Sequence, residues 1–313
     1  MRLHQTTLGC INMKILISGA TGLVGTALTS VFRLDGHTVA HLVRPGGTAR
    51  AEDIRWDPTF ATVDLAALEG SDAIVHLSGA NIAGGRWTPA RKQILRSSRV
   101  DTTRILVDSL ARLRQKPGVF VSASAVGYYG SRGDQVLTES KPPGTDFLSL
   151  VTRDWEAEAI RAEASGIRTV MLRFGVILSA QGGALPQMIA PFKLGAGGRL
   201  GTGKQWMSWV ALDDAIGIIR FAIANARLRG PLNVVAPNPV RNAEFADVVA
   251  TVLRRPAIFR APAFVLRLAL GEMADALLLA SQRVRPEKLL AMDYPFQFED
   301  LGTTLRTIIG GKT

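Results

Sequence analysis

The chain from residue 13 to residue 44 alternates between short apolar runs and one amphipathic stretch. Residues 15–17 are apolar and partly β-branched, which predicts a strand buried on both faces. Residues 38–43 predict a second strand of the same kind, and Asp35-Gly36 separates it from a predicted helix. The apolar positions of that helix recur at helical spacing: Leu23, Val24, Leu28, Val31 and Phe32. Strand, glycine-rich turn, helix and strand together form one βαβ unit of dinucleotide-binding type.

Apolar runs further along predict more strands, separated by helices. The predicted strands cover residues 54–58, 72–80, 118–126, 169–174 and 231–237. The spacing of apolar positions predicts one long helix over 89–114, with Arg99 in its middle, and a helix-like segment over 186–194. A further helix opens within 206–214, Asn242 caps a helix over 243–253, and 263–280 is expected to be an amphipathic helix. No internal repeat is present.

This order of elements predicts an α/β fold with a Rossmann-type, doubly wound, mostly parallel sheet. We expect the dinucleotide-binding domain to comprise residues 13–178 and about 212–234. A smaller, mostly helical substrate lobe is expected from residues 179–211 and 235–313. Residues 1–12 are expected to be a disordered extension, with Met13 as the native start.

Composition indicates an ordinary globular protein. The 313 residues are 47% hydrophobic and 20% charged, and no run reaches the roughly 18 apolar residues of a membrane helix. The single cysteine, Cys10, excludes an internal disulfide and favours a reducing compartment. The first twelve residues lack the apolar core of a secretory signal. We therefore expect a cytoplasmic protein.

The formal net charge of +11 arises from 37 basic and 26 acidic residues. The basic residues are scattered, which favours a solvated surface over nucleic-acid or membrane contact. A small-molecule substrate is the expected partner, and monomer and homodimer both stay open. His37 and His41 have no third ligand nearby, so no metal site is expected. His76, within a predicted strand, is expected to be a packed histidine.

The glycine-rich turn supplies the chemistry of a nucleotide site. Gly19 permits a tight turn after the first strand, Gly22 lets a pyrophosphate approach the backbone, and Gly25 lets helix and strand pack closely. The helix that follows offers free N–H groups and the positive end of its dipole. We expect the cofactor to contact this turn, including Thr21, Leu23 and Val24.

The end of the second strand favours NADP(H) over NAD(H). NAD enzymes place an acidic residue there for the ribose 2′-hydroxyl, but this chain has Arg44 after Val43. A guanidinium suits a 2′-phosphate. The strand over 72–80 ends in small residues, so we expect Leu77, Ser78 and Gly79 to lie along the cofactor.

The chain resembles the short-chain dehydrogenase/reductase superfamily in its extended, epimerase-like form. The residues that carry this resemblance are 19–25, 76–80 and 122–130. More narrowly, it resembles an atypical branch named epimerase family protein, which has its own C-terminal domain. That resemblance rests on Ser98-Arg99, Trp155-Glu156, residues 173–176, residues 201–205, Trp209 with Asp213, and residues 282–286.

The resemblance implies roles for individual residues. Ser124 matches the catalytic serine that binds the substrate oxygen, and Arg99 and Ile177 are placed beside the cofactor. The superfamily's catalytic Tyr-x-x-x-Lys is absent. The register set by Trp155-Glu156 puts Ser149 in the tyrosine place and Arg153 in the lysine place, where Arg153 would hold the nicotinamide ribose.

Two further sets of residues complete the predicted site. Tyr128 or Tyr129 is a candidate displaced acid, although loop packing explains both tyrosines equally well. Gln205, Trp209 and Asp213 are expected to border the substrate cleft, as the corresponding segment does in extended members. Residues 198–204 imitate a phosphate loop, but no Ser or Thr follows Lys204 and no buried strand precedes the loop, so a kinase or ATPase is not expected.

The sequence therefore predicts an NADP(H)-dependent oxidoreductase or epimerase-like enzyme acting on a small polar substrate, with sugar nucleotides among the candidates. The missing Tyr-x-x-x-Lys supports an alternative, a non-catalytic NADP(H)-binding redox sensor or scaffold. A nucleic-acid binder is supported by charge alone.

Overall fold

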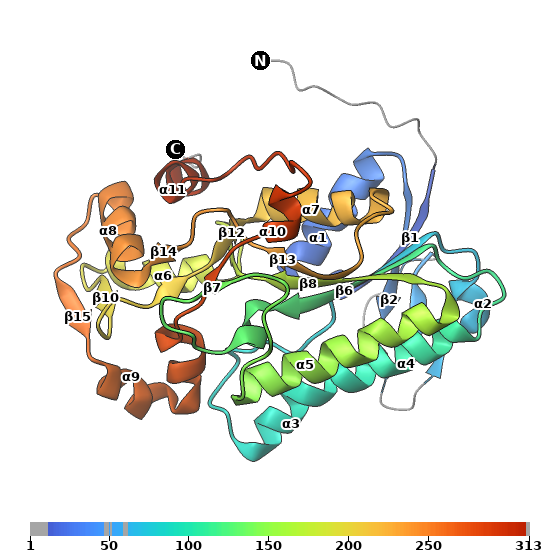
Figure 1. Cartoon of the computed structure of the whole chain (residues 1–313), viewed down its shortest axis with the longest axis horizontal. Coiled ribbons are helices and arrows are strands. Elements are labelled where there is room, and N and C mark those ends of the chain that lie inside the picture. Colours follow the sequence, from blue (N-terminus) through green and yellow to red (C-terminus); the bar gives the residue numbers. More distant parts are fainter. Residues whose placement is uncertain (1–11, 47–49, 51, 59–61, 311–313) are drawn as a thin grey trace, which may run out of the picture.

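A twisted parallel sheet forms the centre of the molecule (Figure 1). The computed structural model describes residues 12–46, 50, 52–58 and 62–310; Cys10 and most of the predicted extension lie outside them. The strand order is β13-β8-β6-β5-β1-β2-β3-β4. All neighbours are parallel except β3 and β4. The strands are β1 (Lys14–Ser18), β2 (Thr38–Val43), β3 (Ile54–Asp57), β4 (Thr62–Val63), β5 (Ala73–His76), β6 (Val119–Ala125), β8 (Arg168–Phe174) and β13 (Gly230–Val234). The predicted doubly wound sheet is confirmed.

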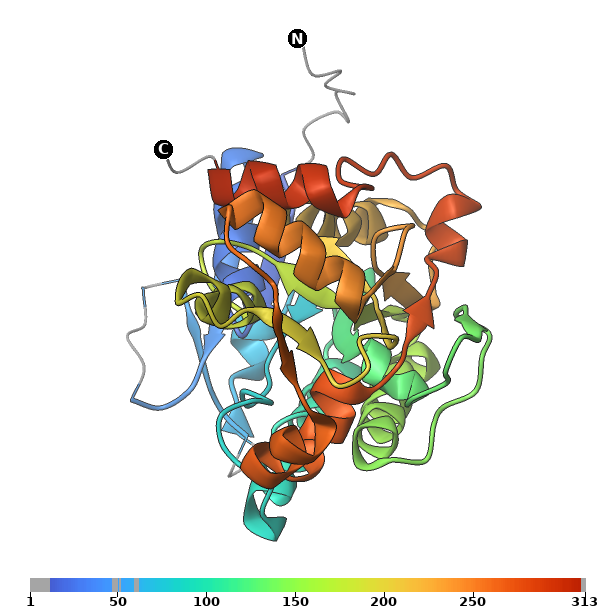
Figure 2. The ribbon, with the colours of Figure 1, turned by 90° about the vertical axis from the view of Figure 1, so that its left-hand side faces the viewer.

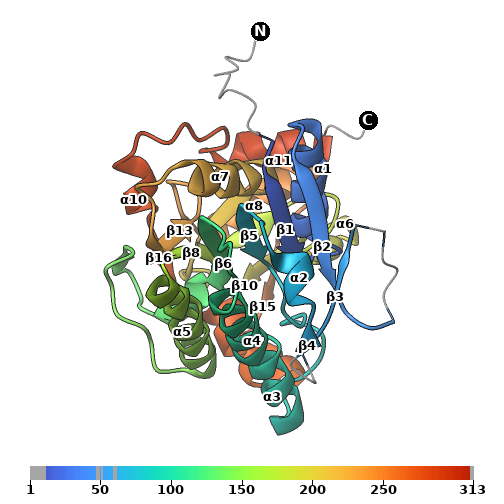
Figure 3. The ribbon, with the colours of Figure 1, turned by 90° about the vertical axis from the view of Figure 1, so that its right-hand side faces the viewer.

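Helices cover both faces of the sheet (Figure 3). On one face, α1 (Leu23–Leu34) and α7 (Leu212–Ala224) pack on a hydrophobic cluster that includes Ile15, Ile17 and Val75. On the other, α4 (Val100–Ala111), α5 (Phe147–Ile160) and the short α2 (Leu65–Leu68) cover the opposite side chains of the same strands. The central strands are apolar on both sides because both sides are covered.

The predicted single helix over 89–114 is wrong. The chain forms α3 (Pro89–Ser97) and α4, with Arg99 between them at φ −114° and ψ −61°. The Arg99 guanidinium donates to the carbonyl oxygens of Leu95 and Ala80, both at 3.0 Å. The Ser98 hydroxyl accepts from Ala80 N–H at 3.0 Å. These bonds tie the junction of the two helices to the loop after β5.

The remaining elements include a second group, which we call the small lobe, beyond the strand ends of the sheet (Figures 1 and 2). Its strands pair as β9 with β12, β10 with β15, and β11 with β14. Its core combines residues on both sides of β13, such as Leu185 and Trp209 before it and Phe245 and Leu305 after it. The small lobe comprises β9 (Val176–Leu178), α6 (Ala184–Lys193), β10 (Gly198–Leu200), β11 (Trp206–Met207), β12 (Trp209–Ala211), β14 (Val240–Arg241), α8 (Asn242–Leu253), β15 (Phe259–Ala261), α9 (Ala263–Leu270) and α11 (Leu301–Gly310).

The other elements lie within the sheet domain, as η2 does between α5 and β8, or between the sheet and the small lobe. They are the 3₁₀ turns η1 (Val126–Tyr129) and η2 (Arg161–Ser165), the paired strands β7 (Val136–Leu137) and β16 (Arg283–Val284), the π-helix η3 (Ala274–Leu279) and α10 (Glu287–Leu290). None of the helices in the described ranges is long and apolar enough to cross a membrane.

The helix expected to open within 206–214 begins at Leu212, after the strands β11 and β12, so this prediction is confirmed. Two other local predictions in this part of the chain are wrong. Asn242 does not cap α8, because its side chain accepts a hydrogen bond from Leu200 N–H at 2.8 Å instead. The helix expected over 263–280 is interrupted at Gly271, which has φ +63° and separates α9 from η3.

Candidate functional site

The glycine turn between β1 and α1 is packed so closely that side chains are excluded at two positions. Gly19 has φ +70°, and a Cβ there would lie 2.7 Å from the Leu77 carbonyl carbon. A Cβ at Gly25 would overlap the Gly19 carbonyl oxygen. Gly22 precedes α1, and no side chain caps that helix end. The first turn of α1 therefore offers its N–H groups to a ligand.

The residues expected to contact a cofactor surround this turn. The N–H of Leu77 donates to the Ser18 carbonyl oxygen at 3.1 Å, which holds the ends of β1 and β5 together. Leu23 faces the loop after β9, because a Cβ added at Gly183 would lie 2.9 Å from its Cδ2 atom. Ile177 packs partly buried against the same hydrophobic cluster as Leu23. Thr21 is exposed at the turn.

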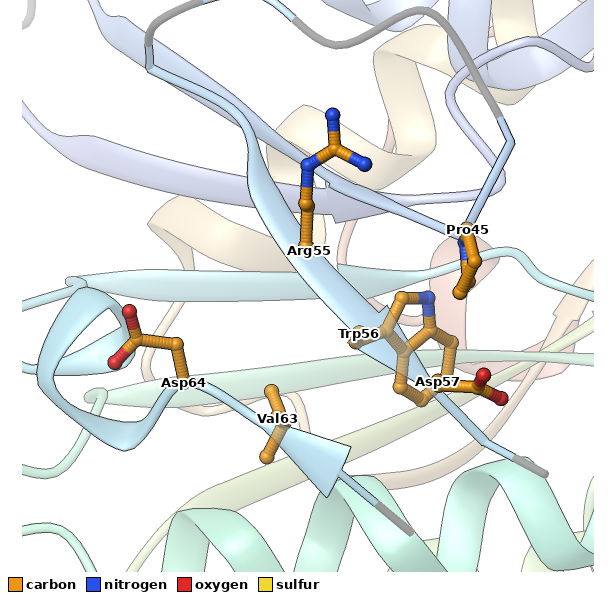
Figure 4. A pocket seen from close by; sticks show the side chains of 6 residues that line it. All are labelled: Pro45, Arg55, Trp56, Asp57, Val63 and Asp64. Atoms are coloured by element: carbon orange, nitrogen blue, oxygen red, sulfur yellow. The ribbon is translucent and has the colours of Figure 1, made fainter. Parts of the chain in front are cut away.

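Arg44 follows the last residue of β2 and is exposed. A cavity of about 350 Å³ lies beside this strand end (Figure 4). Val43 is paired in register with Arg55 of β3, so a second exposed arginine stands next to the end of β2. The cavity is lined by Pro45, Arg55, Trp56, Asp57, Val63 and Asp64. The guanidinium groups of Arg44 and Arg55 suit a phosphate better than a hydroxyl, and two aspartates, Asp57 and Asp64, line the same cavity.

Arg99 lies against the backbone of Gly79. A Cβ at Gly79 would approach its guanidinium carbon to 3.2 Å, and that carbon lies 5.5 Å from the centre of the Trp155 ring. Burial, with the charge of Arg91, lowers the pKa of Arg99 to about 10, so the side chain stays cationic at neutral pH. The structure thus places a fixed cation where the chain leaves β5.

A buried charge pair lies at the end of β6. The Ser124 hydroxyl donates to Oε1 of Glu156 at 2.6 Å. Arg173 of β8 donates to both carboxylate oxygens of Glu156, at 2.8 and 2.7 Å. All three side chains are buried. Burial lowers the pKa of Arg173, but the hydrogen bonds and charge of Glu156 outweigh that effect and raise it overall.

The two tyrosines of η1 extend this network. Tyr129 is completely buried; its hydroxyl donates to Asn233 at 2.7 Å and accepts from Arg173 at 2.9 Å. Burial raises the pKa of Tyr129 to about 12, against the opposing effect of Arg173. Tyr128 is half-buried, and its ring lies 3.5 Å from the Arg173 guanidinium carbon. The Tyr129 hydroxyl is therefore engaged within the protein, whereas Tyr128 is partly accessible.

Arg153 and Ser149, the two residues in the places of the missing Tyr-x-x-x-Lys, both lie on α5. Arg153 is exposed on α5 and pairs with Asp154 at 2.8 Å. Ser149 is fully buried and donates to the Gly127 carbonyl oxygen at 2.9 Å. The face of α5 that points into the protein carries Ser149, Thr152 and Glu156. Glu156 thus occupies the place next to Ser124, and the role of Arg153 toward the nicotinamide ribose stays a prediction.

The residues expected to border a substrate cleft differ in their exposure to solvent. Trp209 is completely buried in the small-lobe core, so it does not line a cleft open to solvent. Gln205 is buried, and its amide group donates to the carbonyl oxygens of Leu200 and Leu278. Asp213 alone is exposed, in the first turn of α7. Trp209 and Gln205 thus hold the small lobe together, and Asp213 stays a candidate for the border of a substrate cleft.

His76 is packed rather than exposed at the site. Its Nδ1 lies 2.6 Å from the Ser18 hydroxyl oxygen, and its ring packs against Trp56 and Phe120. Burial lowers its pKa to about 4. Within the described ranges, no group of three or more His, Cys, Asp or Glu side chains is arranged to hold a metal ion.

The chain matches two family models and is similar in sequence to known proteins. A family model described as NAD dependent epimerase/dehydratase matches residues 15–235. A domain of unknown function, DUF1731, matches residues 261–308. An epimerase family protein of Mycobacterium bovis is 41% identical over 94% of this chain and 97% of its own. The epimerase family protein YfhF of Bacillus subtilis is 40% identical over 96% and 99%.

Two solved structures have the same fold and substantial sequence identity. The human epimerase family protein SDR39U1, solved with NADPH, has a TM-score of 0.87 and 34% identity, covering 95% of this chain and 99% of its own. A nucleoside-diphosphate sugar epimerase from Corynebacterium glutamicum has a TM-score of 0.80 and 36% identity, covering 96% of this chain and 59% of its own.

Proposed function

This chain belongs to the NAD dependent epimerase/dehydratase family, and on that premise we propose that it binds NADP(H) and acts as an oxidoreductase or epimerase-like enzyme on a small polar molecule. The glycine turn carries the proposal. A Cβ would clash with the backbone at Gly19 and at Gly25, and a pyrophosphate could approach the backbone near Gly22, at the uncapped end of a 12-residue helix.

The choice of NADP(H) rests on Arg44. Its guanidinium follows β2, at the position where the ribose 2′ group of a bound dinucleotide lies, and Arg55 adds a second positive charge beside it. The NADPH in the structure of the human relative supports the same choice. A bound NADP(H) supplies hydride acceptance or donation at its nicotinamide ring.

Ser124 is the proposed contact to the substrate oxygen. Because its own hydrogen is donated to Glu156, its oxygen is free to accept a hydrogen bond from a substrate hydroxyl. Glu156, held as a carboxylate by Arg173, would fix the direction of the Ser124 hydroxyl, and Ser124 would position the substrate oxygen. This arrangement favours a substrate with an oxidisable alcohol.

The alternative is an NADP(H)-binding sensor or scaffold that does not turn over substrate. One observation favours it: the buried groups around Ser124 already satisfy one another, with Arg173 paired to Glu156 and Tyr129 hydrogen-bonded to Asn233. Such a closed network stabilises the fold without needing a substrate.

The experiment measures NADP⁺ reduction with a panel of alcohols and sugar nucleotides, and NADPH oxidation with the matching carbonyl compounds. The proposed enzyme gives turnover that Ser124→Ala abolishes while NADPH binding by calorimetry is retained. Ser140→Ala, which changes an exposed serine, serves as the matched control. Tight NADPH binding with no turnover on the whole panel decides for the sensor, and absence of NADPH binding contradicts both.

A further inference from the structure

Two guanidinium groups lie over the ring of Trp206, the first residue of β11. The guanidinium carbon of Arg241 is 4.5 Å from the centre of the ring, and that of Arg283 is 4.6 Å from it. The ring is also held at its Nε1, which donates to Oδ1 of Asp134 at 2.8 Å. Arg241 donates to the carbonyl oxygen of Lys204. We call these five residues the Trp206 cluster.

The Trp206 cluster contains three basic side chains and one acidic side chain. Arg241 pairs with Asp134 at 3.0 Å. In the part of the chain that the structure describes, neither the Arg283 guanidinium nor the Lys204 ammonium group forms a hydrogen bond or an ion pair. The hydrogen bond from Trp206 and the charges of Arg241 and Arg283 lower the pKa of Asp134. The cluster thus stabilises one carboxylate already and keeps two unpaired cations.

The stacked position of Arg283 suits the binding of an anion. An aromatic ring against the face of a guanidinium orients its plane and leaves the N–H groups at its edge available. Those N–H groups match two oxygens of a phosphate or a carboxylate. Arg283 is half-buried, so it has less side-chain freedom to lose when an anion binds.

The stretch over residues 198–204, which imitates a phosphate loop in sequence, ends in this cluster at Lys204. It turns at Gly201 and Gly203, which have φ +57° and +73°, in the region that favours glycine. The buried amide group of Gln205 donates to two backbone carbonyl oxygens and fixes the end of the turn. The backbone of Lys204 is therefore held in place by the residues on both sides of it.

The Trp206 cluster lies near the turn that follows the strand of Ser124. Arg283 is followed by Val284, which packs in one hydrophobic cluster with both tyrosines of η1. Asp134 belongs to the loop between η1 and β7. Ligands bind beyond the C-terminal ends of the strands in folds of this kind, and η1 directly follows that end of β6. The cluster therefore belongs to the part of the small lobe that borders the proposed site.

We propose that Arg283 and Lys204 bind an anionic group of the substrate, a phosphate or a carboxylate, while Ser124 contacts its reacting oxygen. This inference rests on the proposed function and narrows its small polar substrate to an anionic one. Arg283 supplies paired N–H donors, Lys204 adds a second charge, and Trp206 positions Arg283. A neutral substrate would leave both cations without a partner and would bind more weakly.

The experiment measures the binding of pyrophosphate and of citrate to the full chain by calorimetry, after the dinucleotide site has been filled with NADPH. The bound NADPH keeps the anions away from the glycine turn. Arg283→Gln should weaken the binding of at least one anion by about 10- to 100-fold, because it removes a charge-assisted contact. The anion that responds, pyrophosphate or citrate, identifies the group as a phosphate or a carboxylate.

Three further variants complete the measurement. Arg283→Lys keeps the charge but loses the paired donors, so its affinity should fall between wild type and Arg283→Gln. Lys204→Gln, at an exposed position, should also weaken binding. Arg227→Gln changes an exposed arginine near the start of β13, at the opposite end of the strand from the proposed site, and is the matched control. Thermal unfolding verifies that each variant is folded.

Three outcomes would overturn the proposal. The first is wild-type protein that binds neither anion. The second is an equal loss of binding in Arg227→Gln, which would assign the attraction to overall charge. The third is unchanged binding in both Arg283→Gln and Lys204→Gln. Absence of NADPH binding contradicts the proposed function alone, because the same anion titrations without NADPH still decide whether Arg283 is needed.

Discussion

Oε1 of Glu156 accepts two hydrogen bonds at once, from the Ser124 hydroxyl at 2.6 Å and from Nε of Arg173 at 2.8 Å. One carboxylate oxygen therefore joins a serine at the end of β6 to a buried cation on β8. The same atom stabilises the protein by compensating the charge of Arg173, and it would serve the proposed chemistry by fixing the direction of the Ser124 hydroxyl.

Removing the charge of Glu156 should destabilise the protein strongly. In Glu156→Gln, the Arg173 guanidinium stays buried without its counter-charge, which costs about 3–5 kcal/mol for pairs of this kind. Urea unfolding measures the difference in the free energy of unfolding. Glu163→Gln, an exposed glutamate on η2, should change it by less than about 0.5 kcal/mol. Equal stability of the two variants would mean that the buried pair contributes nothing.

Arg44 should decide the cofactor preference. Arg44→Ala removes a charge-assisted contact of about 1.5–3 kcal/mol, so NADPH binding should weaken by about 10- to 100-fold. Binding of NADH, which lacks the 2′-phosphate, should be nearly unchanged, and Arg44→Asp should reverse the preference. Isothermal titration calorimetry with both dinucleotides measures this, with Arg227→Ala as control. Equal weakening of both would show that Arg44 does not read the 2′-phosphate.

Alanine substitutions at two glycines of the turn should differ in their effects on stability. A Cβ at Gly25 overlaps the Gly19 carbonyl oxygen, so Gly25→Ala should cost about 1–3 kcal/mol of stability and weaken NADPH binding. A Cβ at Gly22 meets that oxygen at 3.3 Å, so Gly22→Ala should fold with a smaller loss but still obstruct the pyrophosphate. Thermal unfolding and calorimetry separate the two effects. Unchanged NADPH binding in Gly22→Ala would contradict a phosphate at this turn.

His76 should make the protein sensitive to acid. Burial lowers its pKa to about 4, from an ordinary value near 6.5, so the native state resists protonation that the unfolded chain accepts. The contribution of His76 to the free energy of unfolding is fully present above pH 6.5. It is lost as the pH drops toward 4, and the loss is about 3 kcal/mol in all. His76→Asn should flatten that part of the profile of unfolding free energy against pH. The same slope in both proteins would assign the acid sensitivity to other groups.

The β1-turn-α1-β2 unit could be predicted because all of its signals are local. Strand hydrophobicity, the spacing of Gly19, Gly22 and Gly25, and the periodicity of α1 occur within about thirty residues and agree with one another. The break between α3 and α4 could not be found in this way. It is stabilised by the reach of Arg99 to the Ala80 carbonyl oxygen, a contact between residues that are 19 positions apart.

Only part of the buried network at Ser124 could be predicted from the sequence. Ser124, Trp155-Glu156 and Arg173 all lie in segments that carry the family resemblance, but nothing local indicates that Glu156 and Arg173 pair. A glutamate and an arginine are mostly exposed residues, so their burial appears only once β6, β8 and α5 are assembled. The burial of Trp209 could not be predicted either, because its place in the small-lobe core depends on residues more than thirty positions later.

The small-lobe core has a consequence for how the chain folds. Leu185 and Trp209 are synthesised before β13, and Phe245 and Leu305 after it, so the polypeptide supplies one half of this core, returns to the sheet, and then supplies the other half. Residues 261–308, although matched as a separate domain, bring Leu301 and Leu305 but not the α8 side chains on which they pack. That segment therefore carries only part of the core in which its own side chains are buried.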